Sequence, residues 1–129
     1  MSSLPQLGDA NTAFEPWSWS PDGKRLTVLR HLADSFHAGI GIYDLESRKY
    51  DWLTDFGDFP LWLNDGRRIL FVDRGKIMMI DSKSRKSWPV LSVTDEDVDI
   101  GSLGLSWDNR TIYFTFVYTK ADIWLLTLE

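Results

Sequence analysis

The chain has 129 residues, of which 43% are hydrophobic and 26% charged, so it is long enough for one globular domain with its own core. Its formal net charge of −5 argues against nucleic acid or an anionic membrane as a partner, because those surfaces require clustered basic residues. It contains no cysteine, which excludes disulfides and thiolate zinc sites. No stretch reads as a signal peptide or a membrane span, so we expect a soluble chain, cytoplasmic if Met1 is the natural start.

Runs of β-branched and aromatic residues between turn residues predict strands throughout the chain, and no segment has helical spacing. A short run at 4–7, LPQL, is the first of these strands, and a second ends near Trp19. The others are expected at 25–30, 39–45, 50–56, 68–73, 76–81, 88–93, 111–118 and 121–128. The predicted fold class is therefore all-β.

One eight-residue pattern occurs three times. It reads WSPDGKRL from Trp19, WLNDGRRI from Trp62 and LSWDNRTI from Leu105, with starts 43 residues apart each time. A period of about 40 to 45 residues is typical of a four-stranded propeller blade. A second pattern follows, IYDLESRK from Ile42 and MIDSKSRK from Met79.

The centre of the repeat has the composition of a hairpin turn. Pro21 presets the first turn position, Asp22 accepts hydrogen bonds from the turn, and Gly23 suits a left-handed backbone. The third copy places Asn109 at the glycine position, and asparagine tolerates that conformation best among the other residues. Each copy therefore predicts a tight turn between two antiparallel strands.

Three repeats predict three four-stranded antiparallel blades at about 14–56, 57–99 and 100–129, within a single unit covering 1–129. The third blade ends after its third strand. The strand at 4–7 is spare, as in propellers whose ring closes by exchange of a terminal strand. We therefore expect half of a six-bladed propeller, with 4–7 as a closing strand.

The WSPDGKRL signature, followed by an apolar strand, a hairpin and the IYDLESRK strand, resembles the TolB-like (WD40-like) β-propeller repeat. The resemblance implies six or seven blades in a closed ring that serves mainly as an interaction platform. Three blades cannot close around an axis, so either two chains pair or the chain is part of a longer propeller. We favour a homodimer in which each 4–7 strand completes the third blade of its partner.

Two acidic stretches invite a functional interpretation. DFGDF at 55–59 contains a kinase tripeptide, but no phosphate loop or catalytic-loop motif accompanies it, so turn residues between blades are the better interpretation. Asp95, Asp97 and Asp99 alternate like calcium ligands. Ile100 and Ser106 occupy the glycine and glutamate positions of an EF-hand loop and exclude it, so a solvated acidic connection is favoured over a looser cation site.

The histidines, His31 and His37, lie around Asp34 and Ser35. A serine triad is disfavoured because triads are assembled from distant segments and no GxSxG elbow exists. A surface loop, with a possible binding role, is the better interpretation. Tryptophans such as Trp17, Trp52, Trp62 and Trp124 could stack ligands, but at blade positions they more often fill the core.

The leading functional prediction is a non-catalytic interaction module that binds a protein or peptide and needs no metal or cofactor. The alternatives are the propeller part of a larger enzyme, such as a prolyl-oligopeptidase-like peptidase, a sensor domain of a bacterial signalling kinase, and a small-molecule or metal-binding propeller. No catalytic residue is predicted. The candidate contact residues are Arg30, His31, Asp34, His37, Asp95, Asp97 and Asp99.

Overall fold

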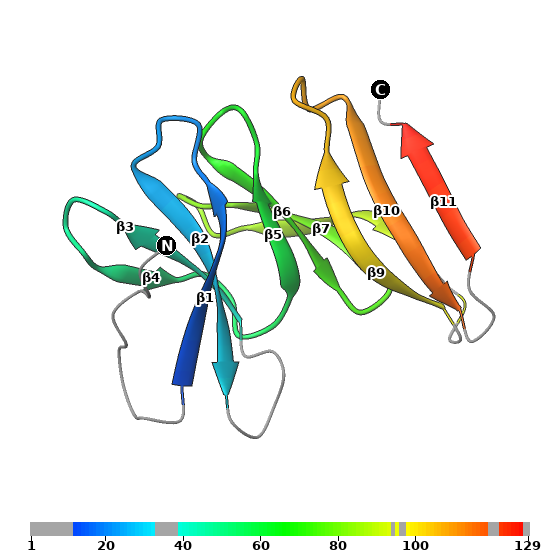
Figure 1. Cartoon of the computed structure of the whole chain (residues 1–129), viewed down its shortest axis with the longest axis horizontal. Coiled ribbons are helices and arrows are strands. Elements are labelled where there is room, and N and C mark those ends of the chain that lie inside the picture. The colour runs from blue at the N-terminus through cyan, green and yellow to red at the C-terminus, as the bar shows by residue number, and fades with distance from the viewer. Residues whose placement is uncertain (1–11, 33–38, 94, 96–97, 119–121, 128–129) are drawn as a thin grey trace.

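A computed structural model describes residues 12–32, 39–93, 95, 98–118 and 122–127, and the statements below concern these residues. They form strands and turns, with no helix and therefore no helical membrane span in the described part (Figure 1). The strands are β1 (Thr12–Trp19), β2 (Arg25–Leu32), β3 (Ile40–Asp44), β4 (Tyr50–Trp52), β5 (Asp58–Trp62), β6 (Arg68–Asp73), β7 (Lys76–Asp81), β8 (Ser87–Ser92), β9 (Val98–Leu105), β10 (Thr111–Tyr118) and β11 (Asp122–Thr127).

The strands form three antiparallel sheets, which we call blades 1, 2 and 3. Blade 1 has the order β1-β2-β3-β4, blade 2 has β5-β6-β7-β8, and blade 3 has β9-β10-β11. The first strands of the blades, β1, β5 and β9, lie next to one another, and the later strands fan outward (Figure 1). This all-β arrangement of meandering sheets is that of propeller blades, as the repeat predicts.

The expected strand at 50–56 was too long. Strand β4 ends at Trp52, because the next two amides, of Leu53 and Thr54, both donate to the single carbonyl of Ile40. The hydroxyl of Thr54 also accepts the amide of Ile40 at 3.1 Å. Strand β4 thus ends four residues earlier than the apolar pattern suggests.

The first turn of each blade, between its first and second strands, has the same geometry in all three copies. Gly23, Gly66 and Asn109 have φ angles of 73°, 66° and 60°, the left-handed backbone predicted for them. The amide of each donates to a carbonyl three residues earlier at 2.9 to 3.1 Å. An aspartate accepts backbone amides within each turn: Asp22, Asp65 and Asp108.

The turn between the third and fourth strands also repeats. The Oδ1 atoms of Asp44 and Asp81 each accept the amides two and three residues further on. Four residues after each aspartate is an arginine in the left-handed conformation, Arg48 at 59° and Arg85 at 63°. The second sequence pattern therefore encodes a local turn, held mostly by one carboxylate.

Blade 2 is covered on both faces. Ile69, Phe71 and Ile80 belong to a core shared with blade 1, whereas Leu70 and Val72 belong to a core shared with blade 3. Since successive side chains of a strand point to opposite faces, the run ILFV supplies both cores. We call these two cores the blade 1–2 seam and the blade 2–3 seam.

Asp81 gives the turn of blade 2 a predictable pH response. The Nε of Arg67 donates to its carboxylate at 2.7 Å, and this bond together with the turn amides lowers the pKa of Asp81 to about 2. A carboxyl group whose pKa falls on folding stabilises the fold above its unfolded pKa, and that contribution disappears as the pH drops toward its folded pKa.

We therefore expect Asp81→Asn to reduce stability at neutral pH and to flatten the loss of stability between about pH 4 and pH 2. Urea unfolding followed by tryptophan fluorescence at a series of pH values measures this. Asp73→Asn is the matched control, because no hydrogen bond in the described part of the chain holds the carboxylate of Asp73. If the free energy of unfolding fell with pH in parallel for Asp81→Asn and the parent chain, the stabilising role assigned to the Asp81 carboxylate would be wrong.

Candidate functional site

The blades have two different ends. The repeated turns lie together at one end, where the amide of Leu45 donates to the carbonyl of Lys24 and that of Ser82 to the carbonyl of Arg67. We call this the turn end; its turns between the first and second strands of each blade are uppermost in Figure 1. The opposite end, called the loop end, carries the connections between second and third strands and those between successive blades. Irregular connections on a rigid sheet are where binding residues commonly lie.

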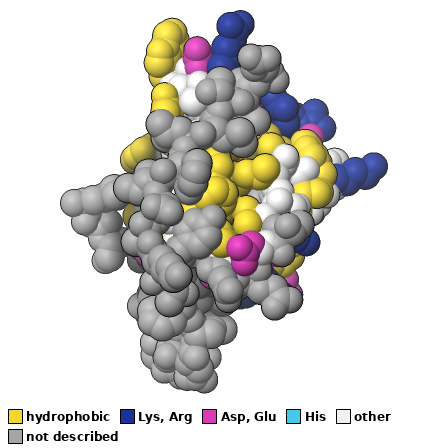
Figure 2. All heavy atoms as spheres, turned by 90° about the vertical axis from the view of Figure 1, so that its right-hand side faces the viewer, with side chains coloured by type: hydrophobic (Ala, Val, Ile, Leu, Met, Phe, Trp, Pro, Cys, Tyr) yellow, Lys and Arg dark blue, Asp and Glu magenta, His cyan; other side chains and the backbone are white. Residues whose placement is uncertain are grey.

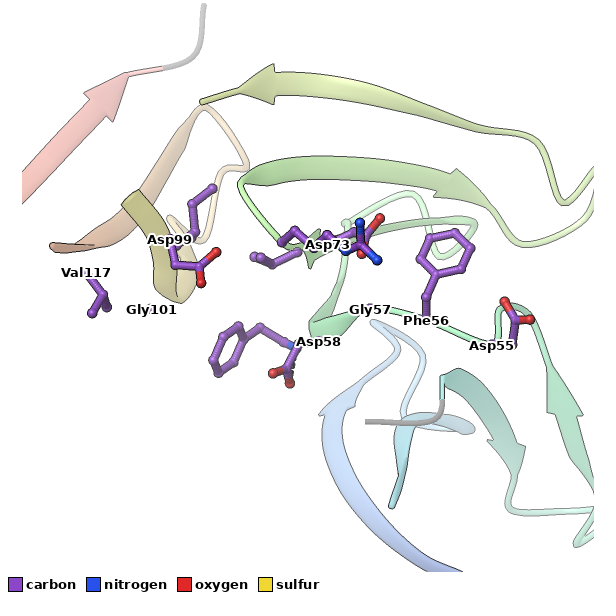
Figure 3. A pocket seen from close by; sticks show the side chains of 12 residues that line it. Asp55, Phe56, Gly57, Asp58, Asp73, Asp99, Gly101 and Val117 are labelled. Carbon is purple, nitrogen blue, oxygen red and sulfur yellow. Dashed lines mark hydrogen bonds between the residues drawn. The ribbon is translucent and has the colours of Figure 1, made fainter. Parts of the chain in front are cut away.

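A hollow of about 540 Å³ opens at the loop end, between blades 2 and 3 (Figure 3). Its walls come from the connection before β5, the end of β6 and the facing strands of blade 3. The lining residues are Asp55, Phe56, Gly57, Asp58, Phe59, Val72, Asp73, Arg74, Asp99, Ile100, Gly101 and Val117.

Antiparallel pairing places the acidic residues of this hollow together. Asp58 is the first residue of β5 and pairs with Val72, the neighbour of Asp73 at the end of β6. Asp99 lies near the start of β9 on the next blade. In Figure 3 these three side chains surround the hollow, and Asp55 lies beyond Phe56 at its far side.

The hollow is negatively charged and has an apolar wall. Four aspartates line it against a single cation, Arg74. In the described part of the chain no hydrogen bond or ion pair engages the carboxylates of Asp55, Asp73 or Asp99, while Asp58 accepts the amide of Phe59 at 2.9 Å. Because the lining carries more negative than positive charge, a cationic group entering the hollow would be stabilised.

Two glycines that line this hollow have backbones that lie close against neighbouring side chains. A Cβ added to Gly101 would lie 2.4 Å from Cγ2 of Val117, and one added to Gly57 would lie 2.7 Å from the ring of Phe71. Gly57 also has a φ of 103°, which side chains rarely adopt. The glycine of the DFGDF stretch therefore allows the connection to pass close to the core, as a turn residue, which agrees with the structural interpretation of that motif.

The predicted contact residues do not form one cluster. Asp99 lines the hollow, from within strand β9 rather than from the connection before it. Asp95 is exposed and is not among the lining residues, and its carbonyl accepts the amide of Val98. Arg30 places its guanidinium 4.9 Å from the centre of the Trp52 ring.

The remaining predicted residues fall wholly or partly outside the described residues. The backbone of His31 belongs to β2, where it pairs with Ala13, but its side chain is not described. Asp34, His37, Asp97 and the proposed closing strand at 4–7 lie outside the described ranges.

Sequence reasoning missed Asp58 and Asp73. Both are charged residues at strand ends, in DFGDFP and RILFVDRG, which is where a residue can face a loop-end hollow. The signal was present, but DFGDF was interpreted only as turn residues. Their convergence with Asp99 depends on the packing of blade 2 against blade 3, which no local pattern contains.

The described residues form neither a metal site nor a ligand-stacking site built on tryptophans. Within the described ranges, no three histidine, cysteine, aspartate or glutamate residues are placed to hold a metal ion. Trp62 is buried in the blade 1–2 seam as a core residue. Trp17 is 37% exposed and packs against Phe59, and the side chain of Trp124 is not described.

The carboxylates of the hollow and those of the turns predict different responses to substitution. We expect Asp73→Asn and Asp99→Asn to change the free energy of unfolding by about 0.5 kcal/mol or less, because neither carboxylate holds a described bond. Asp65→Asn should cost about 1 kcal/mol, because Asp65 accepts two turn amides and the Nε of Arg68. Urea denaturation measures the free energy of unfolding of the three variants. If Asp73→Asn or Asp99→Asn lost as much stability as Asp65→Asn, the carboxylate of Asp73 or Asp99 would have a structural role, which would contradict the prediction.

No family model and no curated protein matches the chain, but solved structures do. A putative TolB from Agrobacterium tumefaciens is 22% identical with a TM-score of 0.69, over 88% of this chain and 42% of that one. TolB from Acinetobacter baumannii is 17% identical with a TM-score of 0.53, over 87% of this chain and 40% of that one. An oligogalacturonate lyase from Vibrio parahaemolyticus is 16% identical with a TM-score of 0.65, over 81% of this chain and 28% of that one.

The chain thus spans less than half of each of these structures, and at these identities the likeness concerns the fold. Their agreement with the three meandering sheets confirms the resemblance stated from the WSPDGKRL repeat. The fold of this chain is that of part of a TolB-like β-propeller.

Proposed function

We propose that the chain is a non-catalytic interaction module that binds a protein or peptide segment at its loop end. The observation that carries this proposal is the hollow between blades 2 and 3, where unengaged carboxylates lie beside apolar side chains. A rigid pair of sheets holds these groups, so little ordering is needed when a ligand binds.

The chemistry of the hollow favours a basic segment with a neighbouring apolar side chain. Asp73 and Asp99 would accept hydrogen bonds from a lysine or arginine, while Phe59 and Val117 would contact an aliphatic or aromatic group. A volume of about 540 Å³ accommodates one or two side chains rather than a folded domain. The partner class is therefore a cationic peptide or an exposed basic loop of a protein.

A second candidate is the propeller part of a larger enzyme. The observation that favours it is the fold shared with the oligogalacturonate lyase, with a TM-score of 0.65. Fold likeness alone does not transfer a reaction. The natural gene distinguishes the two candidates: an adjoining catalytic segment in the same reading frame would favour the enzyme.

We also propose that two copies of the chain pair to complete a six-bladed ring. Blade 1 leaves one face without a neighbouring blade and blade 3 leaves the opposite one, as Figure 1 shows. Trp19 on blade 1 is 53% exposed, and Tyr113 on blade 3 is 45% exposed. Pairing would remove these large side chains from water.

The peptide proposal predicts selective binding of basic peptides. A fluorescent peptide with two arginines beside a leucine should bind, and one with glutamates in place of the arginines should not. Asp73→Asn combined with Asp99→Asn should weaken binding about tenfold or more, since charge-assisted bonds would be lost. Fluorescence anisotropy at low and high salt measures this, and high salt should weaken the binding of the parent chain.

Glu46→Gln combined with Glu15→Gln is the matched control, because it removes the same charge from exposed side chains that do not line the hollow. Equal weakening by both double variants would mean that net charge attracts the peptide, and would contradict the proposed site. Equal binding of the basic and acidic peptides would also contradict it.

The pairing proposal predicts a dimer that depends on the N-terminal segment. Light scattering after size-exclusion chromatography should give a dimer for the full chain. A chain lacking residues 1–9 should dissociate or aggregate if 4–7 closes the third blade of the partner. Monomers of both chains would contradict pairing.

A further inference from the structure

The blades touch each other at the turn end through one repeated position. In blade 1 this position is Pro21, whose Cδ lies 4.0 Å from where a Cβ on Gly66 would be, in the first turn of blade 2. In blade 2 it is Asn64, whose amide donates to Oδ1 of Asn109 at 2.6 Å and whose Nδ2 donates to the carbonyl of Trp107 at 2.7 Å. Both residues therefore contact the first turn of the next blade.

Trp107 occupies the same position in blade 3, 43 residues after Asn64. Its side chain is 89% exposed, the highest value among the exposed large hydrophobic residues of the described chain. A fully hydrated indole is unfavourable compared with one packed on another surface. By the repeat, the surface that Trp107 lacks is the first turn of a following blade.

The first turn of blade 1 lacks the reciprocal contact. Gly66 has Pro21 beside it, but no atom of the described residues lies within 4 Å of a Cβ placed on Gly23. Gly23 is exposed, and the absence of a side chain leaves its backbone accessible to a flat ring. One end of the chain thus offers an unmatched aromatic side chain, and the other an unmatched turn of the kind that this position contacts.

We propose that Trp107 of one copy packs on the Gly23 turn of a second copy and anchors the two chains at the turn end. This inference rests on the proposed pairing of two copies. In a two-fold pair the contact occurs twice, because each copy presents both Trp107 and the Gly23 turn. A second copy fits because its blade 1 carries the same type of turn that follows Pro21 and Asn64 inside the chain.

Arg48 supplies independent support from the outer strands. Its equivalent in blade 2, Arg85, reaches back to blade 1, where Nη1 donates to the carbonyl of Trp52 at 2.8 Å and Nη2 pairs with Asp51 at 2.5 Å. Arg48 has the same left-handed backbone, is exposed, and makes no side-chain bond within the described residues. It is therefore preset to reach a blade that precedes blade 1.

The face of blade 3 that has no neighbouring blade is apolar, as expected for an interface between two copies. Figure 2 looks onto the blade 3 end and shows hydrophobic side chains gathered on it, with basic side chains along one margin. Tyr113 belongs to this face, because it alternates along β10 with Ile112 and Phe114, which belong to the core shared with blade 2. An apolar face with an aromatic residue at its edge is the usual composition of an interface anchor.

The test compares Trp107→Ala with Trp88→Ala by sedimentation or light scattering over a range of concentrations. Trp88 is 41% exposed and lies in β8, the outer strand of the middle blade, so the same truncation is made away from both end faces. Trp107→Ala should raise the dimer dissociation constant about 30-fold or more, as at an aromatic anchor, and Trp88→Ala should leave it unchanged.

The outcomes separate this contact from the broader proposals. A dimer of unchanged affinity in Trp107→Ala would overturn the Trp107 contact and leave pairing intact. A monomeric parent chain would overturn both, while the peptide-binding assay would still report on the function of the loop end. Equal weakening by the two tryptophan variants would also overturn the contact, since it would reflect a general loss of stability.

Cysteine pairing provides a direct test, because the chain contains no cysteine of its own. Chains carrying Trp107→Cys mixed with chains carrying Lys24→Cys should form a covalent heterodimer on mild oxidation, since Lys24 adjoins Gly23. Trp107→Cys mixed with Lys83→Cys, in another turn of the turn end, should not. Absence of cross-linking in the first mixture, or equal cross-linking in both, would overturn the contact.

Discussion

The structure depends on burying both faces of a sheet that cannot bury either face alone. Strand β6 shows the constraint most directly, because Phe71 is fully buried toward blade 1 and Leu70 fully buried toward blade 3. A single blade of a repeat fold cannot bury its hydrophobic faces alone, and neighbouring blades bury them by stacking. Stability therefore belongs to the two seams rather than to the individual blades, as in other repeat proteins.

Polar contacts between blades 1 and 2 fix how the two sheets are oriented against each other. Arg25 lies over the ring of Trp62 and donates to the carbonyl of Gly66 at 2.7 Å, and the hydroxyl of Ser18 donates to the carbonyl of Pro60 at 2.9 Å. Such bonds to backbone carbonyls fix how far one blade is rotated against the next. Hydrophobic contact alone would tolerate sliding of one sheet over the other.

The sequence predicted the parts of the fold that depend on neighbouring residues. The left-handed turns at Gly23 and Asn109 follow from side chains within a few residues of each other. The end of β4 was misjudged because competition for the carbonyl of Ile40 is decided across strands. The acidic hollow escaped prediction for the same reason, since Asp58, Asp73 and Asp99 converge only when the seam forms.

The connection between the second and third strands has seven residues in blade 1, 33–39, but only Arg74 and Gly75 in blade 2. Both blades nevertheless keep the same turns at their other end. The length of a loop-end connection can therefore change without altering the strand register of the blade that carries it. This tolerance makes the loop end the natural place to graft a foreign recognition segment, and the place where descendants of one scaffold would diverge first.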